Sequence, residues 1–101
     1  MAKVKITVVK RDLYTDLVEK YAKNPAGMTA CGLFSDNQEF LLERANMPEG
    51  FCSWAWADIQ RDVVSVFNGA SYPWIKENSA IVSCCTDGLR PVTFLIQKTE
   101  D

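Results

Sequence analysis

Cysteine is the residue type with the widest chemical range in this sequence, because its 101 residues include four cysteines and no histidine. Thiolates alone can bind zinc or an iron–sulfur cluster. The usual signature is a pair of C-x-x-C motifs, and this chain has none. Adjacent strand residues point to opposite faces, so Cys84 and Cys85 can share a tetrahedral site only across a bulge. We expect free thiols packed as small apolar side chains, with a metal site of Cys52, Cys84 and Cys85 as the alternative.

Cys52 is the candidate for a reactive thiol. It directly precedes Ser53, which we expect to be the N-cap of a helix. The free N–H groups and the positive end of the helix dipole favour a thiolate at that position. Because the chain has no histidine, activation would depend on this dipole and on a nearby lysine or arginine.

A second set of candidate residues lies on the polar face of the same helix. Trp54 stands four residues before Asp58, and Arg61 follows Asp58 by three, which are the spacings of neighbours on a helix. An aromatic wall beside a carboxylate predicts a pocket or a partner-binding surface. The alternative is a solvated face on which Trp54 packs beneath the loop that holds Met47 and Phe51.

Arg90 follows the turn-forming pair Asp87-Gly88 and is a further binding candidate. A guanidinium can hold a carboxylate or a phosphate through two parallel hydrogen bonds, although a plain hairpin turn is the simpler interpretation. The lack of histidine excludes Ser-His-Asp and Cys-His catalysis, and no phosphate-binding glycine loop or zinc-protease motif occurs. These observations favour a non-enzymatic protein, and we assign no catalytic residue.

The strongest predicted element is a helix over residues 53–67, with Ser53 as its N-cap and Asn68-Gly69 as a left-handed stop. Its apolar residues recur at helical spacing and form one face, which consists of Trp56, Ile59, Val63, Val66 and Phe67. The opposite face holds Trp54, Asp58, Arg61, Asp62 and Ser65. An amphipathic helix of this kind packs on a sheet.

A shorter helix is predicted over residues 16–22. Asp16 and Glu19 have the spacing of a capping box, and Asn24-Pro25 ends the pattern. The residues at four-residue spacing on one face are Leu13, Leu17 and Tyr21.

Alternation predicts the strands. Residues 3–10 alternate well, with three positions toward the core, namely Val4, Ile6 and Val8. We expect residues 30–34 to form a brief extended segment and residues 39–44 to form a strand. The first strand and the last one, over residues 89–98, are both regular alternators, and we expect them to be neighbours in the sheet.

The C-terminal segment predicts a hairpin. Residues 80–86 and 89–98 flank Asp87-Gly88, which is a pair typical of a type I′ turn. In that register Ile81 faces Phe94. The core side of the hairpin then holds Ile81, Cys85, Val92 and Phe94. Pro91 cannot donate to a ladder and needs an edge or a bulge.

Charge and hydropathy limit the partners and the location. Eleven basic against thirteen acidic residues give a net charge of −2, and no basic cluster exceeds Lys10-Arg11, so we expect no nucleic-acid partner. No apolar run approaches the roughly 18 residues of a membrane span, and residues 1–5 do not lead into a signal-peptide core. We expect a single cytoplasmic domain over residues 1–101, in a compartment where thiols stay reduced.

Two segments carry a resemblance, and they read MPEGFCSWAWADI (residues 47–59) and CCTDGLRPV (residues 84–92). Together with residues 3–10, they resemble a family of short bacterial and archaeal proteins, frequent in anaerobes, whose function is uncharacterised. The likeness covers nearly the whole chain and implies a stand-alone cytoplasmic domain, without implying an activity or a cofactor. The family pattern includes three of the cysteines, Cys52, Cys84 and Cys85. Where the family often has Cys-Pro, this chain has Cys31-Gly32.

These patterns together predict an α+β protein. We expect a small, mostly antiparallel sheet of four to five strands packed against one long amphipathic helix, plus a short N-terminal helix. The leading functional hypothesis is a small non-enzymatic binding or accessory module without a cofactor. It would hold a protein partner or a small ligand at the surface of Trp54 and Asp58, with Arg61 and Arg90 as further contacts.

The competing hypothesis is a thiol-based metal-binding or redox protein, centred on Cys52 with Cys84 or Cys85. Geometry separates the two hypotheses. The binding hypothesis requires Trp54 to line a concave or partner-facing surface. The thiol hypothesis requires sulfur atoms that lie close together, or Cys52 exposed beside a positive group.

Overall fold

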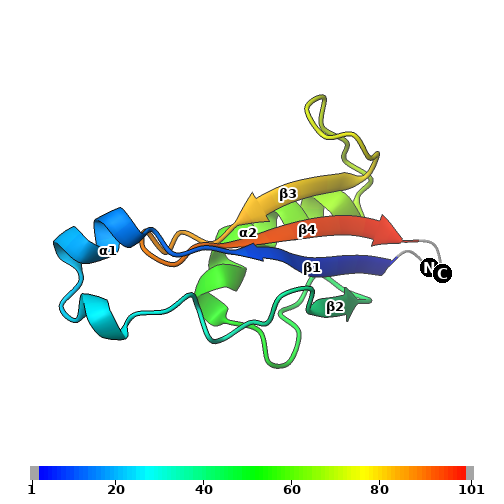
Figure 1. Ribbon diagram of the computed structural model, residues 1–101. Coiled ribbons are helices and arrows are strands. Elements are labelled where there is room, and N and C mark those ends of the chain that lie inside the picture. The colour runs from blue at the N-terminus through cyan, green and yellow to red at the C-terminus, as the bar shows by residue number, and fades with distance from the viewer. Residues whose placement is uncertain (1–2, 100–101) are drawn as a thin grey trace.

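A four-stranded antiparallel sheet is the frame of the computed structural model, which describes residues 3–99 (Figure 1). The strands lie in the order β2 (Glu39–Leu42), β1 (Lys3–Arg11), β4 (Val92–Thr99) and β3 (Ala80–Cys84). Helix α2 (Ser53–Phe67) covers one face of the sheet, whereas α1 (Thr15–Tyr21) and the short 3₁₀ turn η1 (Pro25–Gly27) project beyond its end. The α+β architecture with one long and one short helix is therefore confirmed, and the sheet has four strands among the described residues.

The central pair of strands is β1 and β4, which lie side by side as their alternation predicts. Val4, Ile6 and Val8 are fully buried, so the predicted core face of β1 is confirmed. A bulge interrupts the register after Val8, and beyond it Lys10 pairs with Thr93. A bulge bends its strand, and beyond this one the N–H of Asp12 donates to the carbonyl of Pro91 in the loop that precedes β4.

Helix α2 has its predicted bounds, residues 53–67. Its N-cap is Cys52, so the prediction of Ser53 as N-cap is wrong by one residue. Cys52 has extended backbone angles, and its carbonyl accepts the N–H of Trp56 at 2.9 Å, whereas Ser53 is already helical. At the other end, Gly69 adopts a φ of 81° and stops the helix as expected.

The apolar face of α2 packs on the sheet, and its central residues Ile59, Val63 and Val66 are fully buried. Asp62 departs from the prediction, because only 7% of it is exposed. Its Oδ2 accepts the hydroxyl hydrogen of Ser83 at 2.7 Å, and its Oδ1 lies 3.8 Å from Nε of Arg61. The carboxylate therefore joins the helix to β3 at the margin of the core.

Helix α1 differs from its prediction in start and orientation. It begins at Thr15 after the N-cap Tyr14, and no side-chain cap bond forms, so the capping box is not made. Val18 is its buried residue. The predicted apolar face is half-buried at Leu13 and exposed at Leu17 and Tyr21. The helix extends past the sheet, where no core can receive this face.

Two predicted extended segments are also corrected. Residues 30–34 form turns and bends outside the sheet, and the strand expected over residues 39–44 ends at Leu42. Phe34 is nevertheless buried, with its ring 5.2 Å from that of Phe94 and 5.0 Å from that of Phe51. Aromatic packing, not strand pairing, therefore holds this segment against the core.

The β3–β4 pair has a register different from the predicted one. Ile81 pairs with Ile96 and Ser83 with Phe94, a shift of two residues. Because side chains alternate with a period of two, the shift leaves the faces unchanged. Cys85, Val92 and Phe94 are buried as predicted, and Cys84 points outward and is exposed.

The shift arises because residues 85–91 form an open loop and not a two-residue turn. The carboxylate of Asp87 accepts the N–H of Leu89 and the N–H of Arg90, which keeps the chain from closing directly into a hairpin. Pro91 precedes the ladder, and its carbonyl accepts the N–H of Asp12 at 3.0 Å. The loop therefore runs beside the segment that leaves β1.

Candidate functional site

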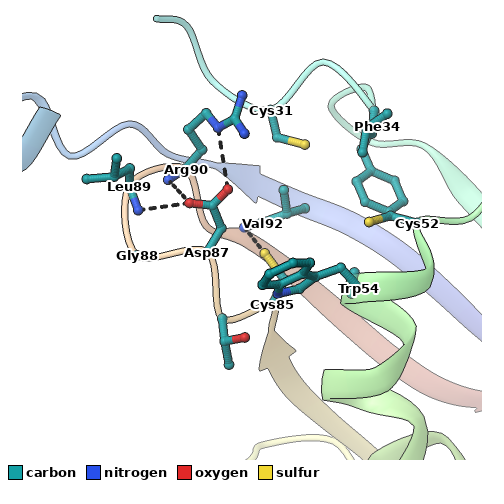
Figure 2. Close-up of a pocket in the computed structure, with 13 residues that line it drawn as sticks. Cys31, Phe34, Cys52, Trp54, Cys85, Asp87, Gly88, Leu89, Arg90 and Val92 are labelled. Atoms are coloured by element: carbon teal, nitrogen blue, oxygen red, sulfur yellow. Dashed lines mark hydrogen bonds and ion pairs between the residues drawn. The ribbon is translucent and has the colours of Figure 1, made fainter. Parts of the chain in front are cut away.

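A pocket of about 530 Å³ lies at the end of the sheet where β3 ends and β4 begins (Figure 2). Three segments enclose it: the loop at residues 31–34, the start of α2 at residues 52–55, and the loop and strand start at residues 85–92. Ligand pockets commonly have volumes of roughly 300 to 1,000 Å³ with mainly apolar walls. This pocket therefore has the size and the character of a small-molecule site.

Helix α2 contributes an aromatic wall and a thiol. Trp54, in the first turn of the helix, is 70% exposed, and its ring lies along the pocket near Cys85. Cys52, as the N-cap, makes no side-chain cap bond, and its sulfur points into the pocket. Ala55 is buried between them and the core. The predicted concave surface beside Trp54 is present.

The loop that precedes β4 forms the polar rim of the pocket. Asp87 Oδ1 accepts the N–H of Leu89 at 2.9 Å and the N–H of Arg90 at 3.0 Å, and Asp87 Oδ2 lies 3.4 Å from Arg90 Nε. Partial burial raises the pKa of Asp87, but the two N–H donors and the charge of Arg90 outweigh it, so the pKa lies below its ordinary value. Among the described residues, Arg90 is engaged through Nε, which leaves its terminal nitrogens for a ligand.

Asp58 secures this loop to α2. Its Oδ2 accepts the N–H of Thr86 at 2.7 Å and the hydroxyl hydrogen of Thr86 at 2.9 Å. Thr86 lines the main pocket, whereas Asp58 lines a shallow hollow on the other side of Trp54. Asp58 therefore positions the wall of the pocket and does not face into it.

A close backbone and thiol contact fixes the floor. The N–H of Cys85 donates to the carbonyl of Val92 at 3.0 Å, and the N–H of Val92 donates to Cys85 Sγ at 3.2 Å. Both residues are buried at the inner end of the pocket. The sulfur of Cys85 is thereby oriented by a neighbouring strand and held in one place.

The loop at residues 31–34 is anchored by Arg11 at the end of β1. Arg11 Nη1 donates to the carbonyl of Cys31 at 2.9 Å, and Arg11 Nε donates to Asp36 Oδ1 at 2.9 Å. This hydrogen bond, and the charge of Arg11, hold the pKa of Asp36 below its ordinary value. Burial of Phe34 fixes the other end of the loop. Cys31 is thus presented to the pocket from a tethered segment.

The pocket brings together only part of the predicted site. Trp54, Cys52, Cys85 and Arg90 line it, and Asp58 supports it from behind. The remaining two candidates lie elsewhere, Arg61 exposed on α2 and Cys84 exposed on the opposite face of the sheet.

Cys31 was considered among the four cysteines of the sequence but was not predicted to be a site residue, although it lines the pocket. The sequence shows that Cys31 is one of only four cysteines, which could have marked it as a candidate. However, no pattern in its loop predicted that it would lie near Cys52 and Cys85. Within residues 3–99, no group of three or more cysteine, histidine, aspartate or glutamate side chains could hold a single metal ion.

In the described part of the chain, no helix combines the length and the apolar character needed to cross a membrane. A comparison with protein-family models, with curated proteins and with solved structures finds no match to this chain. The resemblance of residues 47–59 and 84–92 to a family of short bacterial and archaeal proteins therefore stays a prediction.

Proposed function

We propose that this chain is a small non-enzymatic binding module that holds a ligand in the pocket beside Trp54. The observation that carries the proposal is the position of Trp54, a large aromatic side chain that is 70% exposed and forms one wall of a pocket of about 530 Å³. Leaving such a surface in water is unfavourable by roughly 25 cal/mol per Å² of apolar area. A ligand that covers Trp54 recovers this free energy on binding.

The walls support one kind of ligand chemistry. Trp54, Phe34 and Leu89 offer apolar surface, while Arg90 stands at the rim as the cationic group. Such a site favours a compact apolar or aromatic molecule that carries an anionic group. Asp58 contributes to ligand binding indirectly, because its hydrogen bonds to Thr86 hold the pocket wall against α2.

A thiol-based function is the second candidate. The observation that favours it is that three cysteines, Cys31, Cys52 and Cys85, line the same pocket. All three are free thiols. Cys84, which the sequence grouped with Cys52, lies on the opposite face and would take no part.

Replacement of Trp54 tests the binding function. We expect Trp54→Ala to weaken binding of the probe anilinonaphthalene sulfonate by about tenfold, which corresponds to about 1.4 kcal/mol, because the aromatic wall is lost. Isothermal titration calorimetry of the purified chain measures the affinity. Trp74→Ala is the matched control, since Trp74 is also 70% exposed and lies outside the pocket.

The charge of the rim is tested with a second probe. N-phenylnaphthylamine has the same rings without the sulfonate, so Arg90→Met should weaken the binding of the sulfonate probe alone.

For the Trp54 test, equal probe affinities of Trp54→Ala and the unmodified chain, or a larger loss of affinity in Trp74→Ala, would contradict the proposed function.

A further inference from the structure

Three thiols converge on the pocket from three separate segments of the chain. Cys31 comes from the loop after η1, Cys52 from the N-cap of α2, and Cys85 from the end of β3. Figure 2 shows the three sulfur atoms on different sides of the pocket, with that of Cys85 at its floor, where it accepts the N–H of Val92. Three of the four cysteines of the chain therefore line one cavity.

The arrangement does not suit a single metal ion. A tetrahedral zinc ion holds each sulfur at about 2.3 Å, which brings the sulfurs into near contact with one another. No group of three side chains in residues 3–99 meets that requirement. A polynuclear centre is different, because each thiolate binds a different metal atom and the sulfurs stand farther apart. Thiolates spaced around a cavity are the ligands of iron–sulfur clusters.

We propose that the pocket holds a four-iron, four-sulfide cluster ligated by Cys31, Cys52 and Cys85. This inference rests on the second candidate function, because it assigns one ligand to the three thiols that line the pocket. Three irons of the cube take one cysteine thiolate each. Cys84 is exposed on the other face of the sheet and cannot reach the fourth iron, which is left open toward the rim.

The polar contacts of the pocket suit an anionic thiolate centre. The N–H of Val92 donates to Cys85 Sγ at 3.2 Å, and hydrogen bonds to ligand sulfur are among the contacts that set the properties of such clusters. Cys52 lies at the positive N-terminal end of α2, and its side chain makes no capping hydrogen bond. Arg90 also lines the rim, where its charge is partly compensated by the Asp87 carboxylate at 3.4 Å.

The apolar walls protect the same centre. Phe34 and Val92 are buried beneath the cavity, and Trp54 covers its side. Exclusion of water limits the loss of iron from the cluster and lowers the local dielectric around it. Arg11 holds the Cys31 loop through the Cys31 carbonyl, so that the third ligand is fixed before the cluster binds.

Anaerobic reconstitution tests the proposal. The full chain is incubated with equal amounts of ferrous and ferric iron and with sulfide, so that assembly needs no further oxidant and the thiol protons pass to the buffer. We expect about four iron and four sulfide per chain, with the visible absorption of a cluster and a paramagnetic signal after reduction with dithionite. Cys31→Ser and Cys52→Ser should each lower the iron content at least fivefold.

Cys84→Ser is the matched control and should keep the full iron and sulfide content, because Cys84 lies outside the pocket. Cys31 and Cys52 are chosen because they are half-buried, whereas Cys85 is 8% exposed and its replacement can disturb the core. Circular dichroism confirms that each variant is folded. Reconstitution should also abolish binding of anilinonaphthalene sulfonate, since the cluster occupies the pocket.

Four outcomes would overturn the cluster proposal, and the first three concern the reconstituted chain and its variants. These three are a folded chain that binds zinc alone, equal loss of iron in Cys84→Ser and Cys52→Ser, and unchanged probe binding after reconstitution. A chain that binds the probe through Trp54 but takes up no cluster would also overturn it while leaving the proposed function intact. Failure of the probe to bind the cluster-free chain would instead count against the proposed function.

Discussion

Phe94→Ala is expected to lower the free energy of unfolding by about 3 to 5 kcal/mol, which is the usual cost of deleting a buried phenylalanine side chain. Phe94 is fully buried in β4, and its ring packs 5.2 Å from that of Phe34 and 5.5 Å from that of Phe51. The deletion leaves a cavity beneath the pocket as well as a loss of apolar burial. A domain of this size has roughly 5 to 15 kcal/mol of stability in total, so the effect is large.

Urea denaturation followed by circular dichroism measures this effect. Leu95→Ala is the matched control, because Leu95 is the next residue in β4, is half-buried and points to the open face of the sheet. We expect less than about 1.5 kcal/mol for that variant. A change smaller than about 1 kcal/mol for Phe94→Ala would show that the aromatic cluster is not the centre of the core.

Asp87→Ala is expected to weaken probe binding at least tenfold and to lower the free energy of unfolding by about 1 to 3 kcal/mol. The carboxylate orders the rim of the pocket, since it accepts the N–H groups of Leu89 and Arg90 and pairs with the Arg90 side chain. Without it, two backbone donors lose their acceptor and Arg90 is no longer held at the rim. Asp87→Asn keeps one acceptor oxygen and should have an intermediate effect.

The same carboxylate predicts a pH dependence. Because the pKa of Asp87 in the folded chain lies below its ordinary value near 3.8, its contribution to stability is present above that ordinary value. The contribution is lost as the pH falls through the lowered pKa of the folded state. The difference in stability between the unmodified chain and Asp87→Asn should therefore shrink under strongly acidic conditions, and a difference that grows with acid would contradict this role.

Much of the fold could be predicted because its strongest elements have simple periods. Alternation in β1 identified Val4, Ile6 and Val8 as core residues, and helical spacing identified the buried face of α2. These patterns depend only on which face of an element meets the core. Neighbouring positions of β1 and β4 were also predictable, since both strands alternate over similar lengths.

Local chemistry that competes with a regular pattern was less predictable. The pair Asp87-Gly88 is typical of a two-residue turn, but the Asp87 side chain takes up two backbone N–H groups and opens the loop. The face of α1 that carries Leu17 and Tyr21 has the spacing of a buried stripe, but the helix extends past the sheet and finds no core. Both errors come from contacts that periodicity does not encode.

The candidate site was predicted one residue at a time and not as a set. Trp54 and Cys52 could be assigned to one end of α2 by helix geometry alone. Cys31 and Arg90 reach the same pocket only through tertiary structure, because Arg11 holds the Cys31 loop and Asp87 holds Arg90. Pockets built between separate loops leave little periodic signal in a sequence.

The most direct test of the ligand pocket is an amide NMR titration of the isotope-labelled chain with anilinonaphthalene sulfonate. We expect the largest shift changes at residues 31–34, 52–55 and 85–92, which enclose the pocket beside Trp54. Shift changes concentrated on the open face of the sheet around Val82 and Leu95, with residues 52–55 unaffected, would contradict the account.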